Sequence, residues 1–153
     1  MAVLNLNLEA VVPSDVFGWE VNTDVGYGRE SFTITTAALI GVGEVLVADY
    51  AAKTAVRVGA LADAAAVTAL GDLVIFVGRD LPNNPATAQD FDRLTMAATG
   101  VGVAITRGDG RGTLYKKHLM FGDVAFYDLP ADVQAALVAK FTTENRFKVL
   151  DQV

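Results

Sequence analysis

The stretch that decides the fold reads EVLVADYAAKTAVRVG and covers residues 44–59. Its two ends, Glu44–Asp49 and Ala55–Gly59, are short runs rich in Val, a residue that favours strands. Between them, the residues around Ala51–Thr54 have the composition of a turn. The stretch therefore predicts a strand, a turn and a second strand.

Similar short runs continue outward from it in both directions. Ser31–Thr36 alternates apolar and polar residues with the period of a half-buried strand. Leu73–Val77 (LVIFV) is continuously apolar, as expected for a strand buried on both faces. Val101–Thr106 and Gly112–Met120 flank Gly108-Asp109-Gly110, a sequence typical of a hairpin turn. Two further short strands are expected at Val124–Tyr127 and Arg146–Leu150.

Two segments have the pattern of helices. Ala60–Leu70 is rich in Ala and ends at Gly71, a residue suited to a C-terminal cap. Asp128–Asp132 places Pro130 in a first turn beside acidic residues, which suits the helix dipole. The helix after it should bury one face, made of Val133, Ala136, Leu137, Lys140 and Phe141, with the Lys stem running along that face to water.

Residues 1–26 have a different pattern from the rest of the chain. Leu4, Leu6 and Leu8 alternate with Asn in a strand pattern, and Pro13 and several glycines interrupt any longer element. We expect residues 1–26 to form an extended arm that adds a strand to the sheet edge of a partner, followed by a β-rich domain over 27–153. The alternative is that the segment packs on its own domain as a first strand.

The length, charge and hydropathy of the chain limit the classes of function that fit it. The 153 residues suit one domain, and the formal net charge of −6 argues against a nucleic-acid partner. No apolar run is long enough to span a membrane, and the N-terminus lacks the basic residues of a secretory signal. The basic cluster from Arg107 to Lys117 is expected to be the solvated face of the hairpin.

Signatures of catalysis are scarce. His118 is the only His and there is no Cys, so a His-pair metal site and thiolate chemistry are excluded. Ser14 and Ser31 lie outside any nucleophile motif, and no glycine-rich stretch continues as a phosphate-binding loop. Asp90 and Asp92 lack the ladder of oxygen ligands that a calcium loop needs. We expect a protein that is not an enzyme and needs no cofactor or metal.

The order of these pieces resembles the head decoration proteins of tailed bacteriophages, the family that includes the lambda head protein D. The resemblance lies in Gly26-Tyr27-Gly28-Arg29-Glu30 leading into Phe32-Thr33-Ile34, in Gly43–Val47 followed by Ala55–Gly59, and in the order of elements from Thr113 to the C-terminus. It covers residues 26–60 and 113–153 but poorly matches the long middle segment, especially 81–100.

The resemblance implies a mainly β fold, a small β-clip-like or β-barrel domain with one C-terminal helix and an extended arm. It also implies a homotrimer, made in the host cytoplasm, that lies on the outer surface of the virion capsid at local threefold positions and clamps major capsid protein subunits. Leu4, Leu6, Leu8 and Trp19 would be the capsid-binding residues of the arm, and Tyr27, Arg29 and Glu30 would form its base.

Two other functions fit a small β-rich domain. One is a trimeric nucleotide hydrolase of the dUTPase type, although its nucleotide and magnesium motifs are not found here. The other is a surface adhesion or glycan-binding module that acts through Arg107–Arg111.

Overall fold

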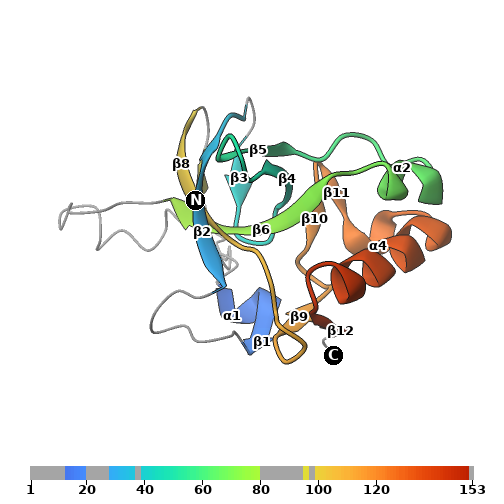
Figure 1. Cartoon of the computed structure of the whole chain (residues 1–153). Coiled ribbons are helices and arrows are strands. Elements are labelled where there is room, and N and C mark those ends of the chain that lie inside the picture. Colours follow the sequence, from blue (N-terminus) through green and yellow to red (C-terminus); the bar gives the residue numbers. More distant parts are fainter. Residues whose placement is uncertain (1–12, 20–27, 37–38, 80–94, 97–98, 152–153) are drawn as a thin grey trace, which may run out of the picture.

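The fold is described from a computed structural model, which places residues 13–19, 28–36, 39–79, 95–96 and 99–151. Its centre is a closed five-stranded barrel in the order β2-β5-β4-β6-β8 (Figure 1). The strands are β2 (Arg29–Ile34), β4 (Val45–Asp49), β5 (Thr54–Arg57), β6 (Asp72–Arg79) and β8 (Gly100–Ile105). All neighbours pair antiparallel except β2 and β5, which run parallel.

The inside of the barrel holds one of two hydrophobic clusters. Its side chains come from alternate positions of the strands, because successive residues of a strand point to opposite faces. They are Phe32, Ile34, Leu46, Ala48, Ala55, Val74, Phe76 and Ala104, together with Ile40.

A second and larger cluster lies between the barrel and an outer layer. Leu73, Ile75 and Val77 of β6 point into it, while Val74 and Phe76 point into the barrel. All five side chains are buried, which confirms the predicted strand with two buried faces. The barrel is therefore covered along β6 rather than standing alone.

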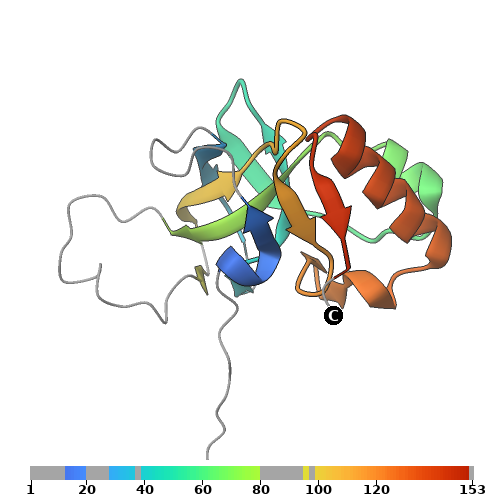
Figure 2. The ribbon, with the colours of Figure 1, turned by 90° about the horizontal axis from the view of Figure 1, so that it is seen from below.

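Two helices form much of this outer layer, α2 (Ala64–Thr68) and α4 (Ala131–Thr143), which lie side by side (Figures 1 and 2). On α4, Val133, Leu137 and Phe141 are buried, as the helical pattern predicts. The Lys140 Nζ reaches the Leu70 carbonyl at 3.2 Å and Glu144 at 2.6 Å, so its stem does run along the buried face.

A three-stranded sheet completes the outer layer, in the order β1-β9-β12 (Figure 2). β9 (Thr113–Tyr115) pairs antiparallel with β1 (Phe17–Trp19) and parallel with β12 (Lys148–Leu150). A four-residue helix, α1 (Pro13–Val16), precedes β1.

The small remaining elements join the layers. β3 (Ile40–Gly41) pairs with β7 (Thr95–Met96), and β10 (Met120–Phe121) forms a tight hairpin with β11 (Val124–Ala125). The 3-10 helix η3 (Phe126–Asp128) follows, where the sequence predicts a strand to Tyr127.

The prediction of a mainly β barrel with a C-terminal helix is confirmed. The prediction of a hairpin around Gly108–Gly110 is wrong. β8 pairs with β2 and β6, whereas β9 belongs to the other sheet. The turn itself forms, with positive φ at Asp109 and Gly110. Its amides bond to the C-terminal segment instead, from Gly108 N to Asn145 O at 2.8 Å and from Gly110 N to Arg146 O at 2.6 Å.

The helix α2 is shorter than the predicted helix over 60–70. It begins after Asp63, whose carboxylate accepts a hydrogen bond from Ala66 N at 3.0 Å, and its C-terminal cap is Ala69 rather than Gly71. No described helix is both long and apolar enough to cross a membrane.

Candidate functional site

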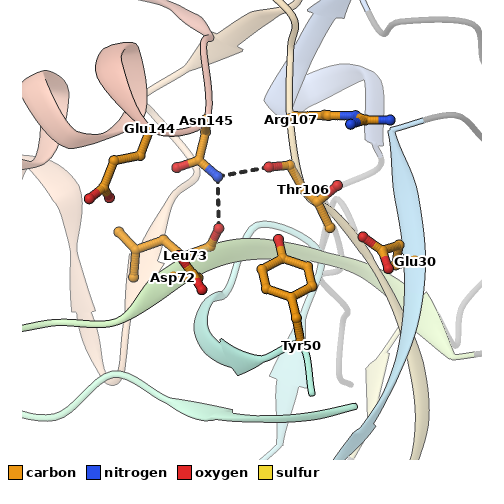
Figure 3. Close-up of a pocket in the computed structure, with 8 residues that line it drawn as sticks. All are labelled: Glu30, Tyr50, Asp72, Leu73, Thr106, Arg107, Glu144 and Asn145. Atoms are coloured by element: carbon orange, nitrogen blue, oxygen red, sulfur yellow. Dashed lines mark hydrogen bonds between the residues drawn. The ribbon is translucent and has the colours of Figure 1, made fainter. Parts of the chain in front are cut away.

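A cavity of about 270 Å³ opens at one end of the barrel (Figure 3). β2 and β6 begin at this end and β4 and β8 finish there, because neighbouring strands of this part of the barrel alternate in direction. The mouths of barrels are common positions for ligand sites. The lining residues are Glu30, Tyr50, Asp72, Leu73, Thr106, Arg107, Glu144 and Asn145.

Asn145 holds the barrel and the end of α4 together at this cavity. Its Nδ2 donates to the carbonyl oxygens of Leu73 and Thr106, each at 2.8 Å (Figure 3). The side chain is buried, with 6% of the residue exposed, and its Oδ1 accepts no hydrogen bond from a described residue. An unpaired buried oxygen is uncommon, because it loses water without gaining a partner.

Three carboxylates and one guanidinium also line the cavity. Glu30 pairs with Lys53 at 2.6 Å, and Glu144 pairs with Lys140 at the same distance. Arg107 lies 3.9 Å from Asp109. The Asp72 carboxylate has no ion pair with a described residue.

The pKa of Tyr50 reflects its burial and the charges at this end of the barrel. In Figure 3 its phenol lies between Asp72 and Glu30. Burial raises the pKa of Tyr50, and the negative charges of Glu30 and Asp72 raise it further. A hydrogen bond with Thr106 and the positive charge of Arg107 act on this pKa in the opposite direction.

A second charged cluster lies where β4 and β5 meet the β10–β11 hairpin. The buried Glu44 accepts from Arg57 Nη2 at 3.4 Å and from Gly122 N at 3.0 Å. Arg57 also reaches Asp123 at 3.2 Å. Burial raises the pKa of Glu44 despite the nearby guanidinium. Since Glu44 is buried and paired with Arg57, we interpret the role of this cluster as structural.

The last strand is held by a third cluster. Tyr127 donates from its hydroxyl to Asp151, and the Lys116 Nζ lies 3.3 Å from the same carboxylate. The hydrogen bond to Asp151 raises the pKa of Tyr127 to about 12. The arrangement fixes the chain just beyond β12 and leaves no free group for chemistry.

The outer face of β2 and its neighbours is exposed and carries mostly hydroxyl and Val side chains, with Arg29 at the start of β2 and Asp49 opposite Thr54 at its edges. Thr33 pairs in register with Val101 of β8 and Thr54 of β5, and a hydrogen bond joins Thr35 to Thr99 at 3.3 Å. Val56 and Val101 are 51% and 46% exposed. We call this surface the outer barrel face; it consists of Ser31, Thr33, Thr35, Thr54, Val56, Thr99 and Val101.

Of the predicted site residues, the structure describes Trp19, Arg29 and Glu30. Leu4, Leu6, Leu8 and Tyr27 lie outside the described residues. The backbone of Trp19 is in β1 and pairs with Thr113. Arg29 and Glu30 begin β2, where Glu30 lines the barrel-mouth cavity.

Part of the range 1–26 belongs to the folded unit. Val16 and Phe17 are buried in the larger hydrophobic cluster, and β1 adds to β9 of the same chain. This matches the alternative in which the segment packs on its own domain. The predicted arm residues 1–12 and 20–26 lie outside the described part and stay a prediction.

Sequence reasoning missed the cavity residues other than Glu30. They are far apart in the chain, and only the closure of the barrel and the docking of α4 bring them together. Glu144 and Asn145 follow the predicted helix, where polar residues are common. The sequence therefore gave only a weak indication that these two residues line a site. Within the described residues, no group of three or more His, Asp or Glu side chains could hold a metal ion.

Comparisons with known proteins add no relative. No protein-family model, no curated protein and no solved structure matches this chain.

Proposed function

We propose that this chain is a structural decoration protein of a tailed-bacteriophage head. It binds the outer surface of the expanded capsid as a homotrimer at local threefold sites and stabilises the shell by clamping major capsid protein subunits. The observation that carries the proposal is the order of sequence pieces that resembles this family, from Gly26–Ile34 to the C-terminal helix and last strand.

The outer barrel face supports a protein that acts by binding. Its seven residues are exposed and uncharged, on a chain in which 20% of the residues are charged. The cores of protein interfaces are depleted in charged residues, because burying a charge without a partner is costly. This face suits contact with another protein copy or with capsid subunits.

The physical mechanism is mass action. A protein that binds only the expanded and assembled shell stabilises that state by its binding free energy. In a trimer, three binding segments act together, so the second and third contacts form at high effective concentration. Weak individual contacts then give firm attachment.

The first test is the mass of the purified chain in solution, followed by sedimentation with empty phage heads. We expect a trimer that co-sediments with expanded heads and not with unexpanded ones. A monomer that stays in the supernatant with both kinds of head would overturn the proposal.

The arm is tested separately by replacing Leu4, Leu6 and Leu8 with Ser in the full chain. Deleting residues up to 24 would be a poor test, because Val16 and Phe17 belong to the core. We expect the triple variant to stay folded and trimeric and to bind heads at least tenfold more weakly. The matched control replaces Asn5 and Asn7 with Ser and should bind normally. Full binding by the Leu variant would remove the arm from the mechanism.

A further inference from the structure

We propose that Asp109 is a site of spontaneous conversion to isoaspartate, and that docking of its loop on the chain after α4 controls the rate of this modification. Asp109-Gly110 is the one Asp-Gly or Asn-Gly pair in the sequence. The turn explains why the pair is there, because φ is 49° at Asp109 and 81° at Gly110, a left-handed conformation that Asp-Gly adopts readily. This chemistry needs neither a partner nor the proposed capsid binding.

The modification is a rearrangement of the chain that needs only water. The Gly110 nitrogen forms a bond to Asp109 Cγ, and one carboxylate oxygen leaves as water with the amide hydrogen and a proton from solvent. Water then opens the resulting five-membered imide. If water breaks the new bond, aspartate is restored. If it breaks the original peptide bond, the product is isoaspartate, in which the main chain runs through Cβ and Cγ.

In the fold, the nitrogen that must attack is engaged as a hydrogen-bond donor. Gly110 N donates to the Arg146 carbonyl oxygen at 2.6 Å. The imide nitrogen carries no hydrogen, so ring closure necessarily removes this bond and leaves the carbonyl without its donor. Because an unmade backbone hydrogen bond costs free energy, the docked loop raises the barrier to ring closure.

The loop is held on both sides of the reactive pair. Gly108 N donates to the Asn145 carbonyl oxygen, and Lys148 N donates to the Gly112 carbonyl oxygen, each at 2.8 Å. Phe147 packs closely on the same loop, since a Cβ built on Gly108 would lie 2.5 Å from Phe147 Cδ1. The peptide unit between these contacts can therefore turn toward the aspartate side chain only after the loop has left the C-terminal segment.

The modification would also prevent the loop from docking again. Its three hydrogen bonds are in register with residues 145–148. Isoaspartate adds one carbon to the main chain between Gly108 N and Gly110 N, so the three bonds can no longer all form. The segment that would be released leads into β12 and contains Asn145, whose side chain ties the end of α4 to the barrel. A transient opening would thus become permanent.

The test is the amount of isoaspartate formed in the full chain during incubation at neutral pH, measured by mass spectrometry on the peptide that contains residue 109. In the native state we expect formation at least about tenfold slower than in the same chain unfolded in guanidinium chloride, because only molecules with an open loop react. Equal rates in the two states would overturn the proposal.

Two variants show whether docking of the loop, rather than the folded state as a whole, sets the rate. Gly108→Ala should form isoaspartate at least about threefold faster than the wild type, because its Cβ meets Phe147 and favours the open loop. Gly59→Ala, where a Cβ meets nothing within 4 Å, should react at the wild-type rate. A wild-type rate in folded Gly108→Ala would exclude docking as the control.

If Gly108→Ala does not fold, Phe147→Leu takes its place. It removes the ring that packs on Gly108 and keeps an apolar side chain. Phe126→Leu makes the same change at a buried ring that lies against Phe121 instead. We expect faster formation of isoaspartate in Phe147→Leu alone. Equal rates in these two variants would show that general loss of stability sets the rate, and the proposal would fail.

Discussion

At the scale of single residues, Glu44 shows how burial and pairing compete. The residue is 4% exposed and its carboxylate pairs with Arg57. The pKa of Glu44 is nevertheless raised, because the loss of water on burial outweighs the attraction of the guanidinium. The Arg57 Nε is itself buried and makes no hydrogen bond with the part of the chain that the structure describes. A pair of this kind joins the barrel to the β10–β11 hairpin without adding much stability.

This balance predicts how stability depends on pH. A carboxyl whose folded pKa lies above its unfolded value stabilises the fold below the unfolded value and loses that contribution as pH rises through the folded one. We therefore expect urea unfolding at pH 4 to 7 to show that the free energy of unfolding of the wild type falls relative to that of Glu44→Gln as pH rises. A wild type that gains on the variant over this range would contradict the assignment.

At the scale of elements, the loop from Gly108 to Gly112 shows why the predicted hairpin does not form. Its amides bond to the chain after α4, and Gly108 packs against Phe147. A Cβ built on Gly108 would lie 2.5 Å from Phe147 Cδ1 and 2.9 Å from the Arg146 carbonyl oxygen. The loop is docked on the C-terminal segment and needs the absence of a side chain there.

Gly108→Ala should therefore lower the free energy of unfolding by about 1–3 kcal/mol, the usual effect of overpacking. Gly59→Ala is the matched control, because a Cβ there would meet nothing within 4 Å and the backbone has no positive φ. It should be neutral or stabilising by up to about 1 kcal/mol. Equal losses in the two variants, measured by urea unfolding, would show that the close approach of Gly108 is not what matters.

At the scale of the whole molecule, the described residues cover one side of the barrel and leave the other exposed. β6 is buried on both faces by the barrel interior and the outer layer, whereas β2 and β5 expose Thr33, Thr54 and Val56. We expect an assembly contact on this face, since removing hydroxyl and Val side chains from water costs less than burying unpaired charges.

Val56→Glu should leave the isolated chain folded, because surface substitutions usually change stability by less than about 0.5 kcal/mol. It should weaken trimer formation or head binding at least tenfold, since an unpaired carboxylate would be buried at the contact. Val124→Glu, at a residue 39% exposed on β11 outside this face, is the control. Normal mass and normal sedimentation of Val56→Glu would exclude the outer barrel face as a contact.

Prediction from sequence worked best where a local pattern had one structural meaning. The alternation in Ser31–Thr36, the apolar run of Leu73–Val77 and the stripe of α4 each specify burial through the geometry of a single element. The pattern around Gly108–Gly110 specified a turn but not its partner. The side chain of Glu30 was singled out, but the cavity that it lines could not be foreseen.

The sequence by itself determined that this is one mainly β domain with a C-terminal helix, because hydrophobic periodicity is a property of neighbouring residues. Only the tertiary structure decided that β2 and β5 close the barrel in parallel, that β9 joins β1 and β12, and that Asp72 and Asn145 line one cavity. These pairings join residues far apart in the chain, and their energy comes from burial shared between elements. No local pattern carries that information.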